Sequence, residues 1–236
     1  MAGGHLDSVD AGPGIQDNGS GSAALLEVAE NMANHPPTNR LRFAWWGAEE
    51  SGLVGSTHYV DHLSERALGQ IALYLNFDMV ASPNYIFMIY DGDGSEFGLV
   101  GPPGSDDIEA TFESFYDDRG IPRAATAFSG RSDYQAFINN GVPAGGLFTG
   151  AEGIKTDEEA AIWGGIAGEQ YDQCYHLACD TIENVSPEAL DVNIDAIAYT
   201  TFHYAMNFDE FPELAAATST AGAASVPAWT TDLATS

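Results

Sequence analysis

The sequence predicts an α/β domain with a mixed, largely parallel central β-sheet flanked by helices. Two observations predict it. Short apolar runs alternate along the chain with segments in which apolar residues recur at helical spacing. Several acidic and imidazole side chains stand at the ends of the apolar runs, and α/β sheets bind ligands beyond the carboxyl ends of their strands. The chain has 236 residues, which is enough for one large domain with a sizeable core.

The first half of the chain contains three predicted strands. The first is the tail of a strand that ends near His5. Only four residues precede His5, too few for a typical buried strand, so we expect the start of the domain to be missing from this chain. The second and third strands are the apolar runs 41–46 and 71–80. The helices predicted between these strands span residues 20–34, 51–63 and 64–68.

The second half continues the alternation. Strands are predicted over 85–90 and 142–148, and helices over 106–119 and 131–139. Residues 149–173 form a long loop with a helix over 158–163. Ser186 and Pro187 give the start of a last helix that runs to about residue 208. We therefore predict a catalytic domain over residues 1–212, truncated at its N-terminus, and a disordered Ala/Thr/Ser-rich tail or linker over residues 213–236.

Charge and cysteine content restrict the partners and the compartment. The chain has 35 acidic residues against 7 Lys and Arg, a net charge of −28, which argues against nucleic-acid and membrane partners. This charge fits a secreted protein, a protein adapted to high salt, or one that binds cations. Cys174 and Cys179 are too few for a structural zinc site, and they could form a local disulfide or remain free thiols. No apolar run is long enough for a transmembrane helix.

Glu49 and Glu50 directly follow the strand predicted over 41–46. Two neighbouring carboxylates repel each other, so their pKa values should separate unless a cation lies between them. One carboxylate could then bind a metal while the other transfers a proton, as a metallohydrolase requires. For an isolated Glu-Glu pair, a solvated turn is the more common interpretation.

Four other residues in the sequence favour a metal site over a solvated turn at Glu49 and Glu50. Together with Glu50 they provide two imidazoles and three carboxylates, a mixed set of nitrogen and oxygen ligands that suits zinc. The four residues are His5, Asp17, Asp78 and His176. Taken singly, each residue has a structural explanation. Asp17 could cap a helix, Asp78 could be half of a buried salt bridge, and either histidine could lie in the core or at the surface.

These residues stand in five separated motifs. The motifs are Gly3-Gly4-His5-Leu6-Asp7-Ser8, Gly14-Ile15-Gln16-Asp17-Asn18-Gly19-Ser20-Gly21, Trp46-Gly47-Ala48-Glu49-Glu50, Asn76-Phe77-Asp78-Met79 and Cys174-Tyr175-His176. In order and spacing they resemble peptidase family M28, the zinc aminopeptidases, and are closest to a secreted bacterial member. The match runs from Gly3 to about Phe208. The resemblance implies the α/β/α sandwich of the zinc exopeptidases, which is phosphorylase/hydrolase-like.

The resemblance also implies a metal centre and an activity. Asp17 would bridge two zinc ions, with His5 and Asp78 completing one site and Glu50 and His176 the other. The implied activity is a secreted, monomeric aminopeptidase that cleaves the first bond of peptides with a free N-terminus and prefers large apolar first residues. A bridging carboxylate can hold two metals about 4 Å apart, where they polarise the carbonyl and activate water.

Roles for three more residues follow from the resemblance. Glu49 would be the general base, and the Tyr175 hydroxyl would donate to the developing oxyanion. Arg131 would lie near the free amine of the substrate, although it could equally pair with Asp133 or another acid. Asp7 is a candidate hydrogen-bond partner for the His5 imidazole, or alternatively the cap of a turn.

Two further features are implied by the same family. Cys174 and Cys179 would form a disulfide around the loop that carries His176. Asp191 and Asp195, one helical turn apart, match a calcium site of a relative, with a solvated helix face as the competing interpretation.

Three other functions remain open. Family members begin well before the Gly-Gly-His motif, so the chain could be an inactive truncated fragment. A glutaminyl cyclase would keep one zinc on this fold. A carboxypeptidase-like relative would recognise a carboxylate, which the scarcity of Lys and Arg disfavours.

Overall fold

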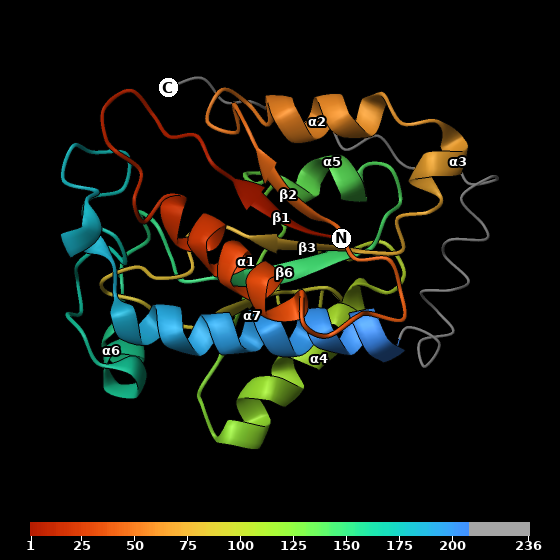
Figure 1. Ribbon diagram of the computed structural model, residues 1–236. Coiled ribbons are helices and arrows are strands. Elements are labelled where there is room, and N and C mark those ends of the chain that lie inside the picture. The colour runs from red at the N-terminus through yellow and green to blue at the C-terminus, as the bar shows by residue number, and fades with distance from the viewer. Residues whose placement is uncertain (208–236) are drawn as a thin grey trace.

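A six-stranded sheet forms the middle layer of the structure, a computed structural model that describes residues 1–207 (Figure 1). The strand order is β2-β1-β3-β6-β4-β5. The tail predicted over 213–236 lies outside the described residues. The strands are β1 (Ala2–His5), β2 (Phe43–Trp46), β3 (Tyr74–Phe77), β4 (Met88–Tyr90), β5 (Ala124–Thr126) and β6 (Ala144–Phe148).

The sheet is mixed and largely parallel, as predicted. β1, β2, β3 and β6 run parallel to one another, whereas β4 pairs with β6 in the antiparallel sense and with β5 in parallel. From β1 the chain passes to β2 on one side and then to β3 on the other. The strand order therefore reverses at β1, and such a switch point is where open α/β sheets bind ligands.

Helices cover both faces of the sheet (Figure 1). One face carries α1 (Gly19–Met32), α4 (Ser105–Arg119) and α7 (Pro187–Asn207), and α7 packs against both α1 and α4. The other face carries α2 (Val54–Asp61), α3 (Glu65–Leu68) and α5 (Tyr134–Ile138). α6 (Asp157–Trp163) and a 3₁₀ turn (Ile182–Asn184) lie in the segment that leads to α7.

Two hydrophobic cores lie on opposite faces of the sheet. Successive strand residues point to opposite faces, and in β3 Leu75 packs in the core under α1, α4 and α7 while Tyr74 packs in the core under α2 and α5. The Tyr74 ring stacks on Phe137 of α5 with the ring centroids 3.8 Å apart. This arrangement is the predicted α/β/α sandwich.

The first strand differs from expectation. The four residues of β1 form a fully buried strand that pairs with both β2 and β3, so the inference that this segment is too short for a buried strand is wrong. Its glycines explain the close packing. A Cβ on Gly4 would lie 2.3 Å from the Phe77 carbonyl oxygen, so only glycine permits this approach of β1 to the end of β3.

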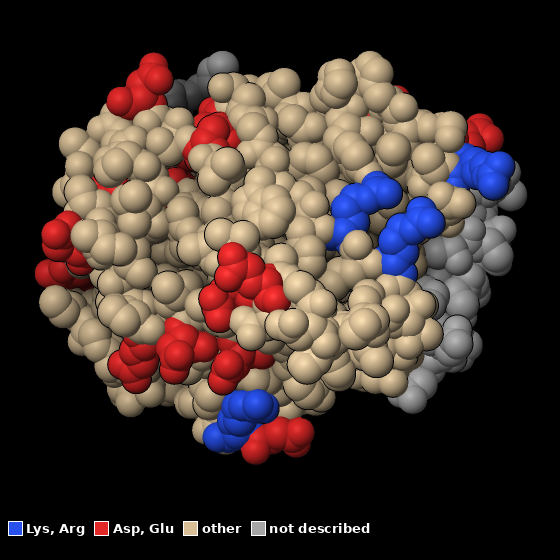
Figure 2. All heavy atoms as spheres, in the orientation of Figure 1, with Lys and Arg blue, Asp and Glu red and all other residues tan. Residues whose placement is uncertain are grey.

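Other differences are small. β5 was not predicted, because Ala124–Thr126 lacks an apolar run. β3 is shorter than the run 71–80, because the backbone leaves the sheet after Phe77. On the face shown in Figure 2, acidic side chains lie mainly over the left and lower parts, whereas basic ones lie right of centre and at the lower edge. Within residues 1–207, no helix has the length and apolar character needed to cross a membrane.

Candidate metal centre and active site

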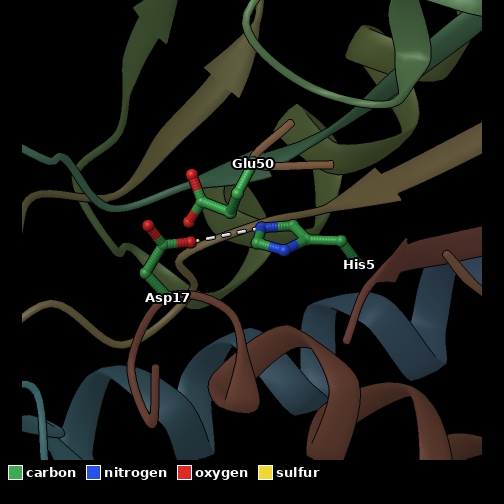
Figure 3. Close-up of side chains that lie close together, drawn as sticks. All are labelled: His5, Asp17 and Glu50. Atoms are coloured by element: carbon green, nitrogen blue, oxygen red, sulfur yellow. Dashed lines mark ion pairs between the residues drawn. The ribbon is translucent and has the colours of Figure 1, made fainter. Parts of the chain in front are cut away.

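Ligand-type side chains from five segments converge at the carboxyl ends of β1, β2 and β3. His5 ends β1, Glu50 follows β2 and Asp78 follows β3. Asp17 comes from the loop before α1, and Figure 3 shows His5, Asp17 and Glu50 pointing toward one another. His176 comes from the loop between α6 and α7. All five predicted metal ligands therefore lie in one place.

The carboxylate of Asp17 lies between the two histidines. Its Oδ1 is 3.1 Å from His5 Nε2, and its Oδ2 is 3.1 Å from His176 Nε2. Each imidazole nitrogen also faces a second carboxylate, Asp78 Oδ1 at 3.1 Å from His5 and Glu50 Oε2 at 3.0 Å from His176. Asp17 is thus shared by two half-sites, each made of one imidazole and one further carboxylate.

Asp7 orients both His5 and the two glutamates. The backbone carbonyl of Asp7 lies 3.0 Å from His5 Nδ1, so a proton on Nδ1 leaves Nε2 free to face the carboxylates. The Asp7 carboxylate accepts the backbone N–H groups of Glu49 at 3.0 Å and Glu50 at 3.3 Å. Asp7 therefore supports the imidazole through its main chain and caps the turn through its side chain.

A chain of side-chain hydrogen bonds fixes Asp78. The Ser132 hydroxyl donates to Asp78 Oδ2 at 2.6 Å and accepts from the Asn76 amide at 2.8 Å. All three residues are buried. Asp78 is consequently held with Oδ2 on Ser132 and Oδ1 on His5.

The loop that carries Asp17 is tied down from two sides. Asp180 accepts the backbone N–H groups of Gln16 at 2.9 Å and Asp17 at 3.1 Å. Asn18 donates to the Phe77 carbonyl and accepts the N–H groups of Gly21 and Met79. The peptide bond between Asp17 and Asn18 is cis. These contacts connect Asp17 to α1, β3 and the loop before α7.

The segment around His176 is closed by the disulfide between Cys174 and Cys179, as predicted. His176 has a φ of 58°, in the left-handed region that residues other than glycine rarely adopt. Ala48 and Met79, which neighbour Glu49 and Asp78, also have positive φ values, 58° and 54°. Backbone strain of this kind clusters at functional sites.

Burial and crowding shift the ionisation of these carboxylates when no cation is bound. Burial, with a contribution from Asp78, raises the pKa of Glu49 to about 9. Burial, and next Asp17, raises the pKa of Glu50 to about 7. Burial acts in the same direction on Asp17, but contacts with both imidazoles outweigh it and lower the pKa of Asp17 to about 2. A bound cation would replace these protons, because it favours every ionised carboxylate around it.

Glu49 lies beside this centre. Its carboxylate is within 4.8 Å of the ligand atoms of His5 and Asp78, and the residue is 8% exposed. It lines a cavity of about 90 Å³. The cavity is also lined by most of the predicted metal ligands and by Tyr90, Thr126, Phe148 and Tyr175.

Tyr175 and Arg131 meet at the rim of this cavity. Arg131 donates to the Tyr175 hydroxyl oxygen at 3.1 Å and forms a 2.6 Å ion pair with Glu152. The acid that Arg131 pairs with is therefore Glu152 and not Asp133. Burial, with a contribution from Asp17, raises the pKa of Tyr175 above its ordinary value, so this hydroxyl keeps its proton at neutral pH.

Asp191 and Asp195, the residues of the predicted calcium site, are both exposed on α7. Neither belongs to the clusters of possible metal ligands among residues 1–207. Their role as calcium ligands stays a prediction.

Three residues of the site were not identified from the sequence. Asp180 directly follows Cys179, so an acid beside the end of a constrained loop was a usable signal. Ser132 and Glu152 carry no such signal, because their roles depend on contacts with segments distant in the chain.

Comparison with known proteins adds to this geometry. The sequence model of Peptidase family M28 matches residues 1–201. The chain is 55% identical over 212 residues to "Leucine aminopeptidase 2" of Arthroderma otae, covering 90% of this chain and 43% of that protein. It is 57% identical over 201 residues to an "Aminopeptidase" of Pseudomonas aeruginosa, covering 85% and 38%. The chain therefore spans less than half the length of these curated relatives.

Solved structures show the same fold. A zinc aminopeptidase from Bacillus subtilis superposes with a TM-score of 0.71 and 28% identity, covering 88% of this chain and 46% of that one. An aminopeptidase from Aneurinibacillus sp. strain AM-1 has a TM-score of 0.64 and 29% identity, covering 86% and 42%.

Proposed function

The chain belongs to peptidase family M28, and from this premise we propose that it is a di-zinc aminopeptidase that removes the first residue of peptides. The observation that carries the proposal is the position of Asp17, whose two oxygens each face a different imidazole at 3.1 Å. One carboxylate shared by two equivalent half-sites is the arrangement that a two-metal hydrolase requires. The aminopeptidases found among its relatives support the same activity.

The donor set fits zinc. His5, Asp17 and Asp78 would hold one ion, and Glu50, Asp17 and His176 the other. The atom His176 Nε2 is buried and makes no hydrogen bond of ordinary geometry among the described residues, and the same holds for Glu50 Oε1. Buried polar atoms of this kind need a partner, and a cation would satisfy both. Zinc in such a pair polarises a carbonyl and makes water acidic enough to attack at neutral pH.

Glu49 is the proposed general base. Its carboxylate lies close to His5 and Asp78 and lines the cavity. Neither proposed zinc half-site needs this carboxylate as a ligand. Its proton affinity is tuned by burial and by Asp78, which favours uptake of a proton from water and its transfer to the leaving amine.

Tyr175 is the proposed oxyanion donor. Because Arg131 donates to the Tyr175 oxygen, the hydroxyl proton points away from the guanidinium and is available to a substrate. This geometry supports stabilisation of the developing oxyanion by a neutral hydroxyl. Arg131 then acts as an orienting residue. The guanidinium of Arg131 repels a cationic substrate amine because the two charges have the same sign, and its ion pair with Glu152 only partly offsets this repulsion. The carboxylates of the centre are therefore the better partners for that amine.

The cavity favours an apolar first residue. Tyr90, Phe148 and Ala151 line it together with most of the proposed metal ligands. The strongly negative charge of the chain attracts the cationic N-terminus of a peptide. We infer that the enzyme works as a secreted monomer, because one chain supplies the whole site and disulfides persist outside the reducing cytosol.

Hydrolysis of leucine p-nitroanilide tests the proposal. The purified chain is assayed as prepared, after chelation and after zinc is added back, and bound zinc is counted by mass spectrometry. Chelator-sensitive release restored by zinc, with two zinc ions per chain, is the expected result. One zinc per folded chain, together with cyclisation of an N-terminal glutamine, would point to the glutaminyl-cyclase alternative. A folded, zinc-loaded chain with neither activity would establish an inactive fragment.

The variant Glu49→Ala separates the base from the ligands. It should retain both zinc ions and lose turnover by at least about 100-fold. Asp118→Asn, which changes an exposed acid on α4, is the control and should keep full activity. A Glu49 variant that loses zinc would show that this side chain is a ligand and not the base.

A further inference from the structure

A second acidic cluster lies away from the proposed zinc centre, where the chain leaves β4. Asp91, Asp93 and Glu109 each place a carboxylate oxygen within 4.8 Å of the others. Asp91 immediately follows β4, Asp93 lies two residues further on, and Glu109 projects from α4. Asp91 is 1% exposed and Glu109 is 9% exposed. The cluster is therefore partly enclosed and open to solvent on the side of Asp93.

One buried oxygen in this cluster has no partner. Asp91 Oδ2 accepts the backbone N–H groups of Glu96 at 3.2 Å and Phe97 at 2.8 Å. Asp91 Oδ1 is buried and makes no hydrogen bond among the described residues. A buried carboxylate oxygen without a partner costs free energy, and a cation would remove that cost.

The backbone of the loop holds the other two carboxylates in place. Glu109 Oε2 accepts the N–H groups of Gly92 at 2.9 Å and Asp93 at 3.2 Å. Asp93 Oδ1 accepts the N–H of Ser95 at 2.8 Å. Main-chain donors thus anchor all three side chains.

No basic side chain in residues 1–207 forms a salt bridge with these acids. The nearest candidate, Arg123, is already engaged by Glu113 and by Asp117, the latter at 3.1 Å. Burial raises the pKa of Glu109, and the neighbouring charge of Asp93 adds to this rise. The charge of Arg123 acts on Glu109 without an ion pair between them, and the three carboxylates still repel one another.

We propose that Asp91, Asp93 and Glu109 bind a calcium ion. The ligand atoms are all oxygen, which suits a hard cation and distinguishes this cluster from the imidazole-containing zinc centre. Asp91, Asp93 and Ser95 also have the one-three-five spacing of the first ligands in calcium-binding loops. Residue 102, where such a loop has its bidentate glutamate, is proline, and Glu109 of α4 supplies the carboxylate instead.

The ion connects a surface loop to the wall of the proposed active site. The Asp91 backbone N–H donates to the Thr126 carbonyl at 2.9 Å, and Asp91 follows Tyr90 directly. Tyr90 and Thr126 both line the cavity beside the zinc ligands. Calcium therefore fixes the ends of β4 and β5 and, through them, one wall of the substrate cavity.

Thermal unfolding of the zinc-loaded chain in calcium-free buffer tests this site without any measurement of activity. Calcium at about 1 mM, roughly ten times the dissociation constant expected for an extracellular site, should raise Tm by about 3–6 °C. Magnesium at the same concentration should have little effect, because it gives up its water reluctantly. Titration calorimetry should show one calcium per chain.

Three variants locate the binding. Asp93→Asn changes the exposed ligand and should abolish the calcium-dependent rise in Tm while the variant still folds. Asp118→Asn, an equal change of charge on the same helix as Glu109, should keep the rise. Asp191→Asn should also keep it. A rise that survives in Asp93→Asn but disappears in Asp191→Asn would place the ion on α7 and overturn the proposal, as would a wild-type chain that does not respond to calcium.

Discussion

Ser132 determines where the Asp78 carboxylate points, because its hydroxyl donates to Asp78 Oδ2 at 2.6 Å. The substitution Ser132→Ala should lower the affinity for one of the two zinc ions by about 10–100-fold, the usual effect of losing a partner that orients a ligand. The second ion should be retained, since Glu50 and His176 do not contact Ser132. Zinc competition against a chromophoric chelator measures both affinities. Ser114→Ala, on α4, is the control, and equal affinities in the two variants would contradict this role.

Asp133 is fully buried, and burial raises its pKa to about 7 against the smaller, opposing effect of the Ser56 hydroxyl. Because the folded chain keeps a proton that an unfolded aspartate with a pKa of 3.8 releases, the free energy of unfolding should fall as pH rises from about 4 to about 7. The slope from this one group is at most about 1.4 kcal/mol per pH unit.

Asp133→Asn removes that slope and keeps the shape of the side chain. Urea unfolding of the metal-free protein at several pH values should show the variant gaining stability relative to wild type as pH rises, and the two should differ least near pH 4. A difference that is constant across this range would show that Asp133 does not bind the proton.

The loop between α6 and α7 carries His176, one of the proposed metal ligands, and the disulfide of Cys174 with Cys179 closes it. The double variant Cys174→Ser/Cys179→Ser should lose about 2 kcal/mol of stability, because a short loop is released in the unfolded chain. Its main effect should be on the ion that His176 binds. We expect that ion to dissociate first during dialysis, while the ion held by His5 remains. Loss of both ions at equal rates would argue that the loop does not control one site separately.

β2 and β3, two of the strands that position the centre, could be predicted because each lies in an apolar run with an acid near its end. The run 41–46 ends before Glu49 and Glu50, and the run 71–80 contains Asp78. β5 could not be predicted in the same way, since Ala124–Thr126 is stabilised by pairing with β4 and not by its own composition. The short β1 was misjudged because its burial depends on neighbours on both sides.

The candidate site likewise has features that the sequence predicts and features that it does not. The five proposed metal ligands could be named from motifs, because ligand chemistry restricts the residue types, and the structure brings these five residues together. Their supports depend on tertiary contacts. Ser132 reaches Asp78 across 54 positions of sequence, and Asp180 reaches Asp17 across 163. The contact of Ser132 leaves no local pattern in the sequence, and that of Asp180 leaves only its place beside Cys179, so the folded chain is needed to reveal the partners of both.

The charge of the whole molecule affects its stability. With a net charge of −28, acidic side chains repel one another in the folded state, and added salt screens this repulsion. The Tm should therefore rise by several degrees as sodium chloride increases from about 0.01 M to about 0.5 M. Sucrose at matched osmolality is the control for effects on hydration. A Tm that falls with salt would show that the attractive pairs around the histidines outweigh the repulsion.

The proposed zinc centre joins residues from opposite ends of the described chain. His5 belongs to the first strand, whereas His176 precedes the last helix. A ribosome makes a protein from its N-terminus, and domains fold as units once enough of the chain has emerged. The two zinc half-sites share Asp17, so both cannot be complete before His176 has been synthesised. A nascent chain is thus unable to cleave peptides through most of its translation, and the proposed activity arises only when the domain is nearly finished.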